Sequence, residues 1–447
     1  MKIQIKIKTK TPIWTGNIDS KSELIQSTSI IGSLRWWTEA ILRGMGKFAC
    51  DPTGDERCSK EELQYCPACL IFGATGVRRL FRLEISGGTK VFDDGAINIK
   101  PTGRNRGWYL GSGLTEEIPE ITKIPEITLY IVPLDRDFDD NILLMPLTIA
   151  ANWGGIGART QHGYGVVELG SKSGIKLDGF KNALNRILDS NRLNKLEIRE
   201  RKEKNTFLSN IKEIFFAKVQ FNVQSDNWWK EVDGIKQALN PKDRKGNIDR
   251  EVQQKNNKVL EAWHNSGSVP VSPAIKNWLR YREGRQLWNT GENWLFGTKE
   301  RVCGICFNEV KRDEKNQSKY WCSNCKLSLK AEKTVEKVAS KINISSAYRI
   351  NENLWEFRIW GWIPEKENPN GFDRNNFLNG LKEALNGKEP SNDTGSTKIP
   401  WTNLLGSQTN NHKLKVWREF KSSRDTVKPE EENIESYLQS LLEIEEG

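Results

Sequence analysis

Asn152-Trp-Gly-Gly-Ile-Gly-Ala-Arg-Thr-Gln-His-Gly-Tyr-Gly165 is the stretch that most constrains the fold. Its five glycines allow positive φ angles or close approach of another backbone, and exposed N–H groups in such a loop suit phosphates. Arg159 adds a planar charged fork. Neither common nucleotide signature fits, because Gly163-Tyr-Gly165 leads into Val-Val-Glu-Leu, which is typical of a strand. The stretch is therefore either a ligand-binding loop or an ordinary glycine-rich turn.

The residues around this loop predict one compact unit. A helix over 141–153 leads into the loop, and 165–169 closes the unit as a strand. Upstream, Ile3, Ile5 and Ile7 alternate with lysines as in a strand, and further strands are expected at 79–85 and 126–132. With a helix over 27–44, the order strand, helix, strands, helix, strand is the ferredoxin-like plan.

The helix over 27–44 has one apolar face. The buried stripe is expected to contain Ile30, Ile31, Leu34, Trp37 and Ile41. Arg35, Trp36, Glu39 and Arg43 fall largely off this stripe. We expect these four side chains to be free to meet solvent or a ligand.

A second unit begins after a polar stretch. Strands are expected at 214–223 and 355–363 and a helix at 272–281. Asn277-Trp-Leu-Arg-Tyr281 parallels Leu34-Arg-Trp-Trp37, and Trp294-Leu-Phe-Gly297 parallels Leu70-Ile-Phe-Gly73, so we interpret the halves as a duplication. Residues 240–257 and 364–397 are expected to be loops or insertions. Residues 430–446 carry apolar side chains at helical spacing and predict a docking helix, on this chain or on a neighbour.

These patterns predict an α+β protein in which the first unit follows the ferredoxin-like plan, the second unit partly repeats the first, and the second carries a zinc-ribbon insertion. The first domain would span 1–170 and include the glycine-rich loop 152–165. A linker would cover 171–210. The second domain would span 211–447, with the ribbon at about 299–330.

Two groups of cysteines suggest metal. Cys303-Gly-Ile-Cys306 and Cys322-Ser-Asn-Cys325 have the spacing of a four-cysteine zinc ribbon, whose zinc would be structural. Free thiols or an iron centre are the alternatives. Cys50, Cys58, Cys66 and Cys69 fit less well, because only Cys66-Pro-Ala-Cys69 resembles a knuckle. For this group zinc and buried free cysteines both stay open.

Composition favours an acidic partner. The net charge of +10 suits nucleic acid or an anionic membrane surface. Several of the seventeen tryptophans lie beside arginines, as in Arg35-Trp-Trp37, a combination suited to stacking on bases, although most are expected in the core. The amino terminus alternates like a strand and no apolar run is long enough to span a membrane, so we expect a cytoplasmic protein with no membrane partner and with reduced thiols.

No catalytic group stands out among the titratable residues. His162 lies in the glycine-rich loop and is expected to contact a ligand, with acid–base and structural roles as alternatives. His264 and His412 lie in polar stretches and are expected at the surface. The run from Asp135 to Asp140 lacks the spacing and glycine of an EF-hand and predicts a solvated turn.

Four motifs in order carry a family resemblance. They are Thr11-Pro-Ile-Trp-Thr-Gly16, Thr28-Ser-Ile-Ile-Gly-Ser-Leu-Arg-Trp-Trp-Thr-Glu-Ala40, Cys69-Leu-Ile-Phe-Gly-Ala-Thr-Gly76 and Gly154-Gly-Ile-Gly-Ala-Arg-Thr-Gln-His-Gly163. Together they resemble the RAMP superfamily of CRISPR proteins. The likeness is greatest to the first RAMP subunit of the type III-B (Cmr) RNA-targeting effector complex. It covers residues 1–170 well and the second half thinly.

The resemblance implies two ferredoxin-like (RRM/RAMP) domains packed together. It also implies a non-catalytic RNA-binding subunit of a ribonucleoprotein used in antiviral defence. The chain would bind the 3′ part of the CRISPR guide RNA, help capture target RNA and contact neighbouring RAMP subunits, while cleavage belongs to partner subunits. Backbone N–H groups around Gly154, Gly155 and Gly157 would contact phosphates. The side chains expected at the RNA are Arg35, Trp36, Arg43, Arg78, Arg79, Arg104, Arg106, Arg159, Gln161, His162 and Tyr164.

Other functions stay open at this stage. A solvated face is an equal alternative for Arg78 and Arg79 and a weaker one for Arg104 and Arg106. A RAMP endoribonuclease that matures guide RNA would need a base near the scissile phosphate, and only His162 is a candidate. A zinc-stabilised scaffold that binds protein partners alone is the third interpretation.

Overall fold

The computed structural model describes residues 2–443, except 17–21, 55–56, 59–63, 93–94, 105–106, 116–126, 171–174, 190–196, 200–207, 289, 315, 317, 367 and 387–397. Arg106, parts of the expected linker and the last residues of the acidic tail lie outside the described residues. None of the helices in the described part is long and apolar enough to cross a bilayer.

The first sheet contains four antiparallel strands in the order β3-β8-β1-β9. Two helices, α1 and α3, pack together beside it, and the chain order is strand, helix, strand, strand, helix, strand. Alternation along β1 and the three-to-four spacing along α1 set which side chains turn inward. The bounds are β1 Ile3–Thr9, α1 Ser27–Gly44, β3 Phe81–Ser86, β8 Ile127–Pro133, α3 Asn141–Trp153 and β9 Val167–Leu169.

The second sheet repeats this relative order. Its strands run β12-β19-β20-β11-β21, and β18 also pairs with β20. With α7 after β11 and α9 before β21, the second sheet and its helices follow the same plan, with the second strand split in two. The bounds are β11 Ile214–Val223, β12 Ser268–Val269, α7 Ser272–Tyr281, β18 Ile342–Ile344, β19 Ala347–Arg349, β20 Leu354–Trp362, α9 Arg374–Leu385 and β21 Thr409–Glu419.

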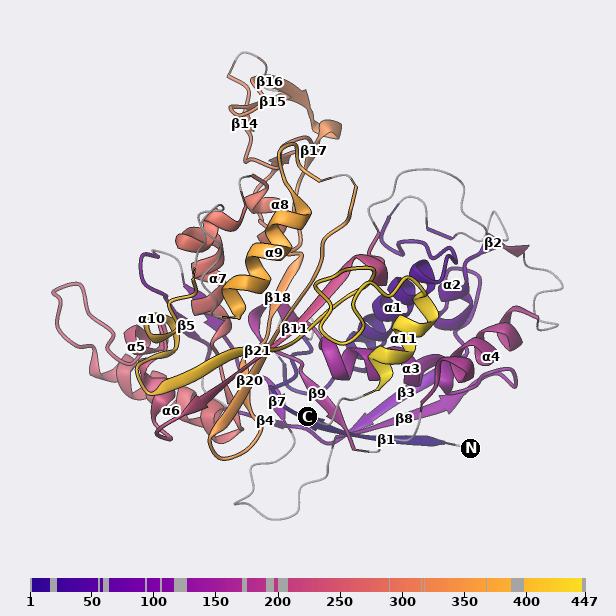
Figure 1. The fold of residues 1–447 in the computed structure, drawn as a ribbon, viewed down its shortest axis with the longest axis horizontal. Coiled ribbons are helices and arrows are strands. Elements are labelled where there is room, and N and C mark those ends of the chain that lie inside the picture. The colour runs from indigo at the N-terminus through magenta and orange to yellow at the C-terminus, as the bar shows by residue number, and fades with distance from the viewer. Residues whose placement is uncertain are drawn as a thin grey trace.

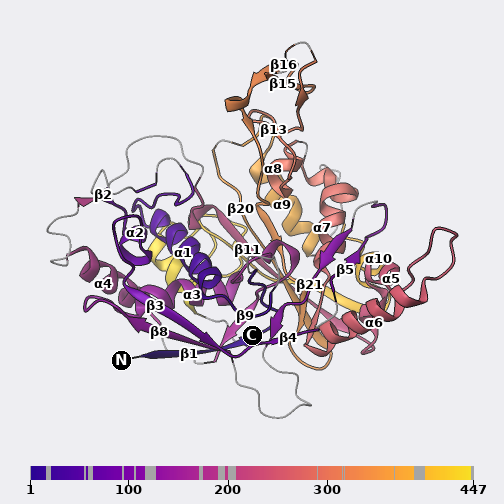
Figure 2. The ribbon, with the colours of Figure 1, turned by 180° about the vertical axis from the view of Figure 1, so that it is seen from behind.

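The two sheets share the layer formed by α1 and α3. Phe216 of β11 stacks on Trp37 of α1, with ring centroids 6.2 Å apart, and also packs against Trp153 of α3. Its neighbour Phe215 points to the other face, where it stacks on Trp417 in the second core. The resulting layers are sheet, helices, sheet, helices, and Figures 1 and 2 show the second sheet running through the middle of the molecule.

Each core draws side chains from the far half of the sequence. The carboxyl-terminal helix α11 (Ile434–Leu442) packs on α3 and on α4 (Leu177–Leu188) in the first core (Figure 1). Conversely, Ile97 and Leu110, on the hairpin of β5 (Ile97–Ile99) and β6 (Trp108–Leu110), pack in the second core. The docking helix is thus confirmed on this chain, and the expected linker contains a core helix.

The duplication noted in the sequence has a structural counterpart. Arg35 of α1 donates from Nη1 to the carbonyl of Gly73, at the end of α2 (Pro67–Phe72), at 3.0 Å. Arg280 of α7 donates from Nη1 to the carbonyl of Gly297, at the end of α8 (Glu292–Phe296), also at 3.0 Å. Both glycines have positive φ. The short sequence parallels therefore mark equivalent places in the two halves.

Two regions expected to be loops or insertions contain helices. α6 (Arg250–Asn265) begins inside the stretch 240–257, and α9 lies inside 364–397. Asp249 and Asp373 cap these helices by accepting from the N–H groups of Val252 and Asn376. Charged residues on the outer faces of these helices make the two stretches polar in composition. The inner faces are apolar and contain buried residues such as Trp263 and Leu381.

The ribbon insertion projects from the body of the second half (Figure 1). It contains β13 (Val302–Cys303), which pairs with β17 (Thr334–Val335), and a three-stranded sheet of β14 (Lys311–Arg312), β15 (Lys319–Cys322) and β16 (Leu327–Lys330). Apart from its cysteines, its own hydrophobic cluster contains little more than Leu329 and Val310. So small a core favours stabilisation by a metal.

Candidate nucleic-acid interface and metal centres

A cleft separates α1 and the glycine-rich loop from the second sheet. It contains two hollows of about 440 and 460 Å³. Gly32, Trp36, Ser340, Asn343 and Trp360 line both hollows, so the two form one continuous depression. The first half of the chain contributes one wall and the second half the other.

Some of the predicted RNA contacts line this cleft and others do not. The residues at the cleft are Arg35, Trp36, Arg43, Gly155, Gly157 and Gln161. The residues that line neither hollow are Arg78, Arg79, Arg104, Gly154, Arg159, His162 and Tyr164. Ser340, Lys341, Asn343, Trp360 and Trp362 of the second half were missed, because nothing in the sequence places them opposite α1.

Trp36 is the exposed aromatic group of the cleft. Its side chain is 37 % exposed, and its ring stands edge-on against the buried ring of Trp37, with centroids 4.9 Å apart. Gly32, one turn earlier on α1, leaves open space beside it, since a Cβ there would meet nothing within 4 Å. An accessible indole in an open polar cleft suits stacking on an unpaired base.

Arg35 and Arg43 are not free, in contrast to the expectation from the helical pattern. Both carry ion pairs to Glu39, at 2.7 and 3.4 Å, and Glu39 is only 5 % exposed. Arg43 also donates to the carbonyls of Ala49, Cys50 and Ser209. Of the four residues expected to be free, Trp36 alone is exposed.

The glycine-rich loop uses most of its N–H groups inside the protein. Gly154 donates to Ala150, Gly157 to the Ser33 hydroxyl and Gly165 to Pro12, at 2.9–3.0 Å. A Cβ on Gly154 would lie 2.3 Å from Trp37, and one on Gly165 would lie 2.0 Å from the Ile156 carbonyl. The glycines therefore allow close packing within the chain. The N–H groups of Gly154 and Gly157, which were expected to contact phosphates, are bonded inside the protein.

Arg358 of the second sheet fixes the start of this loop. Its buried guanidinium donates from Nη1 to the carbonyls of Ala151 and Gly154, at 2.7 and 3.2 Å. These carbonyls lie at the carboxyl end of α3, where a cation is favoured by the helix dipole. The loop position thus depends on the second half of the chain.

The polar side chains of the loop differ in accessibility. Arg159 has φ 58° and lies over the Trp14 ring at 3.8 Å, partly exposed. Tyr164 is fully buried, and its hydroxyl donates to the Gly111 carbonyl at 2.7 Å, so its ring is not placed to stack on a base. Gln161 lines the first hollow.

All three histidines lie in environments that oppose protonation. Burial lowers the pKa of His162 to about 3, with further lowering from Lys276, Arg159 and Lys299. His264, expected at the surface, is buried between Trp229 and Trp355, and burial lowers its pKa. His412, also expected there, stacks on Trp401, and burial lowers its pKa to about 4.

The basic runs outside the cleft have local roles. Arg78 is exposed and donates to the Leu134 carbonyl at 2.9 Å. Arg104 stacks on the Tyr281 ring at 3.6 Å, and it belongs to the hairpin that packs on the second half. Tyr109 in the same hairpin is 67 % exposed and was not singled out from the sequence.

Both cysteine groups assemble as four-sulfur clusters. Cys303, Cys306, Cys322 and Cys325 place their sulfurs within 4.8 Å of one another, and so do Cys50, Cys58, Cys66 and Cys69. Tetrahedral zinc with Zn–S bonds of about 2.3 Å requires sulfur–sulfur distances of about 3.8 Å. Observed separations include 3.5 and 3.9 Å in the ribbon and 3.5 and 3.7 Å in the first cluster. Disulfides, at about 2.05 Å, are excluded among these cysteines.

The first third of the chain matches a known family. Residues 6–168 match the RAMP superfamily, which confirms the resemblance drawn from the four motifs for this part of the chain. No curated protein matches the sequence.

Solved CRISPR structures show weaker likeness over longer spans. The apo form of Cmr1 from Pyrococcus furiosus is 12 % identical, with 92 % of this chain and 98 % of that chain covered and a TM-score of 0.31. A chain of the type III-B Cmr-beta complex bound to cognate target RNA is 13 % identical, with 80 and 94 % covered and a TM-score of 0.29. A chain of a type IV-B CRISPR complex is 15 % identical, with 38 and 89 % covered and a TM-score of 0.26.

Proposed function

We propose that this chain is a non-catalytic RNA-binding subunit of a type III-B CRISPR (Cmr) ribonucleoprotein, built from two ferredoxin-like domains. It would bind the 3′ part of the guide RNA and help to capture target RNA beside neighbouring RAMP subunits. One observation carries the proposal. Two of the motifs shared with the RAMP superfamily, on α1 and in the glycine-rich loop, form one wall of a cleft whose other wall is the second sheet.

The chemistry of the cleft suits a sequence-tolerant contact with RNA. Trp36 offers a stacking surface, and Gln161, Ser340 and Asn343 offer hydrogen bonds. Lys341 lies between the Trp294 and Trp362 rings, at 4.9 and 4.3 Å, and burial lowers its pKa to about 8. It is therefore mostly charged at neutral pH and available to a phosphate.

The absence of catalysis is proposed from the histidines. A general acid or base works best with a pKa near the operating pH. Burial holds the pKa of His162 and His412 far below neutrality, and it also lowers that of His264. None of the three suits cleavage of RNA at neutral pH.

We further propose that the ribbon cluster binds structural zinc. Four cysteines leave no open coordination position for a reaction. N–H groups of the ribbon point at its sulfurs, as Ile305 donates to Cys303 and Cys325 donates to Cys322, both at 3.4 Å. These contacts suit thiolates that hold a metal.

The cleft is tested by substitutions at Gly32, where no neighbour obstructs a side chain. Gly32→Glu places a carboxylate between Trp36 and the far wall, so affinity for single-stranded RNA should fall and the salt dependence of binding should weaken. Trp36→Ala should weaken binding by roughly 5- to 150-fold, equivalent to about 1–3 kcal/mol for one stacked base. Fluorescence anisotropy with labelled RNA measures both.

Gly32→Ala is the matched control, because it fills the same position without charge or bulk. If Gly32→Glu and Trp36→Ala bind RNA like Gly32→Ala, the cleft is not the RNA site.

The identity of the RNA is tested in the native host. Gentle purification of the tagged chain, followed by sequencing of the bound RNA, should recover short CRISPR-derived guides together with other RAMP subunits. Recovery of the chain alone, or with unrelated RNA, would contradict the proposal. Cleavage of repeat RNA that His162→Ala abolishes would favour a guide-processing endoribonuclease instead, and binding to protein partners without RNA would favour a scaffold.

A further inference from the structure

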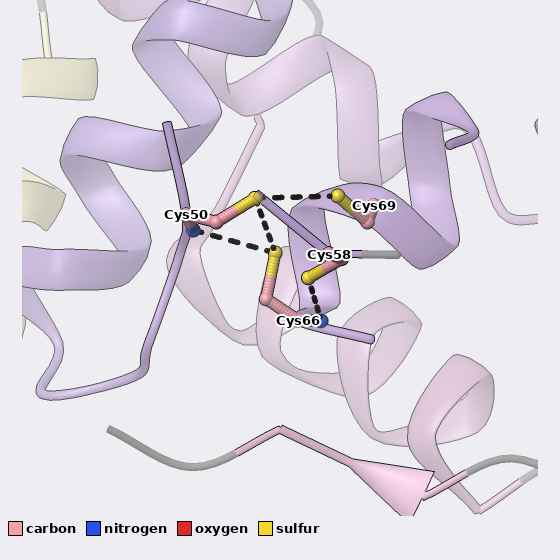
Figure 3. A group of neighbouring side chains, drawn as sticks. All are labelled: Cys50, Cys58, Cys66 and Cys69. Carbon is pink, nitrogen blue, oxygen red and sulfur yellow. Dashed lines mark hydrogen bonds between the residues drawn. The ribbon is translucent and has the colours of Figure 1, made fainter. Parts of the chain in front are cut away.

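The first cysteine cluster lies against α1, behind the cleft. Its four thiols are buried and come from the segment 50–58 and the start of α2 (Figure 3). Backbone N–H groups point at two of the sulfurs, since Cys50 donates to Cys66 at 3.5 Å and Cys66 donates to Cys58 at 3.2 Å. The arrangement resembles a four-thiolate metal centre despite the irregular spacing of its cysteines in the sequence.

A row of charged side chains on α1 joins this cluster to the cleft. Arg35 donates from Nη2 to the Cys69 sulfur at 3.1 Å and from Nε to Glu39 at 2.7 Å. Glu39 also accepts from Arg43 at 3.4 Å, and Arg43 donates to the Cys50 carbonyl at 3.0 Å. Spacing of four residues puts the three side chains on one face of the helix, so the row reaches both Cys50 and Cys69.

The charge of a bound metal would explain this row. Zinc with four thiolates carries a net charge of −2, and an uncompensated charge in a buried site is costly. Two guanidinium groups lie beside the cluster and are held in place by the Glu39 carboxylate, which offsets one of their charges. The row therefore supplies a net +1, which balances part of the charge of the cluster. Outer-sphere donors of this kind orient and stabilise metal ligands.

We propose that Cys50, Cys58, Cys66 and Cys69 bind a zinc ion and that Arg35 and Arg43 are its charge-balancing outer sphere. The two arginines then position the metal ligands and do not bind RNA phosphates. The proposal does not depend on the proposed function, because its test measures metal. It also explains why two cations at the edge of a candidate RNA cleft are engaged in ion pairs with the buried Glu39.

The second half of the chain supplies a matched control. Arg280 contacts Gly297 as Arg35 contacts Gly73, and it also bonds Glu292 and Asn293, each at 3.0 Å. None of these partners is a cysteine. Replacing Arg280 therefore removes an equivalent half-buried guanidinium that makes no direct contact with a cysteine.

The experiment measures zinc in the purified full-length chain and its release to a chromogenic chelator. We expect two zinc ions per chain, of which Cys69→Ser removes one and Cys306→Ser the other. Arg35→Gln should speed release of one ion by roughly 10- to 100-fold, as for other outer-sphere substitutions, and leave the second unchanged. Arg280→Gln should release both ions like the unsubstituted chain.

Three results would overturn the proposal. They are a single zinc ion that Cys306→Ser removes, iron in place of zinc at the first cluster, and normal zinc release from Arg35→Gln. If Arg35→Gln does not fold, Arg35→Lys serves instead, because it retains the charge but loses the planar donors and should speed release to a smaller extent. Loss of RNA binding in Arg35→Gln with unchanged zinc release would assign Arg35 to RNA and refute its outer-sphere role.

Discussion

At His162, burial and charge both oppose protonation. The ring meets the edge of Trp108, with centroids 5.0 Å apart, and no described residue bonds its buried Nδ1. Three cations, Lys276, Arg159 and Lys299, add repulsion to the effect of burial on the pKa. A neutral ring wedged between the two halves is a structural element more than a reactive one.

His162 should make the free energy of unfolding depend on pH in the acid range. Its folded pKa of about 3 lies below the ordinary 6.5, so the unfolded chain binds the extra proton between these values. Stability therefore falls as pH drops from about 6.5 towards 3. His162→Phe retains a ring against Trp108 and should remove about one proton from the uptake on unfolding, measured by urea denaturation at several pH values. An unchanged proton uptake would show that the folded ring is protonated.

Arg159 is the cation of the glycine-rich loop that has no ion pair among the described residues. It lies on the Trp14 ring, and the residue is partly exposed. Arg159→Glu should weaken binding to single-stranded RNA and lower the salt slope by about one or two units, at roughly 0.7 per phosphate contact. Arg78→Glu, outside the glycine-rich loop, is the control. An equal effect of both substitutions would indicate only a general loss of positive charge.

The sequence predicted the surroundings of some residues correctly and the contacts of others wrongly. The spacing of cysteines predicted the ribbon cluster, because two knuckles are a local pattern. The exposure of Trp36 followed from helical periodicity, but the hydrogen bonds of Arg35 did not, because its partners Gly73 and Cys69 are distant in sequence. The residues of the far wall of the cleft could not be predicted for the same reason, because they are distant in sequence from α1.

At the scale of elements, the glycine-rich loop is a packing device between α3 and its neighbours. Trp37 occupies the space that a Gly154 side chain would need and donates to the Gly155 carbonyl at 3.2 Å. Ser33 of α1 exchanges hydrogen bonds with Gly157, at 2.9 and 3.2 Å. The loop and α1 are thereby held as one surface.

Gly154→Ala should destabilise the fold by about 1–3 kcal/mol, the usual cost of forcing a methyl group into a packed core. Gly32→Ala, in an open helical position, should be neutral or stabilising by up to about 1 kcal/mol. Thermal unfolding of the two variants makes the comparison. Equal melting temperatures would mean that Trp37 moves aside without cost, and the packing role of Gly154 would be refuted.

For some elements with clear hydrophobic periodicity, the sequence predicted both ends correctly. The bounds of α3, β11 and α7 agree with the predicted 141–153, 214–223 and 272–281. α9 was missed, although Phe377, Leu381 and Leu385 recur every four residues, because asparagine and glycine dominate its surroundings. Local composition thus outweighed a helical pattern that tertiary packing stabilises.

At the scale of the whole molecule, the two halves exchange segments. The hairpin of β5 and β6 belongs to the first half in sequence and to the second core in space, and α11 does the reverse. Neither half therefore has a complete core without the other. This exchange explains why domain boundaries drawn along the sequence do not describe the packing, since hydrophobic patterns show that a segment is buried but not against what.

The carboxyl-terminal helix should therefore be required for the amino-terminal fold. The carbonyl of Leu441 in α11 accepts from the indole N–H of Trp153, at the end of α3, at 2.8 Å. The side chain of Leu441 is fully buried, as are those of Tyr437 and Leu438. At about 1.5–3 kcal/mol for each apolar side chain, their removal is comparable with the total stability of a domain.

A chain ending at Asn433 should lose cooperative unfolding of its first half and exchange the amide protons of α3 rapidly, although α3 lies about three hundred residues away in sequence. A chain ending at Glu443 removes a similarly acidic end without touching α11 and is the control. Leu441→Ala should give a milder loss of about 2–5 kcal/mol, and hydrogen exchange with thermal unfolding compares all three. If the chain ending at Asn433 melts like the control, α11 is an accessory helix and the two halves are independent domains after all. If only the amide protons of α3 become exchangeable, α11 supports the glycine-rich loop through its hydrogen bond with Trp153. RNA binding should then be lost together with the structure of α3.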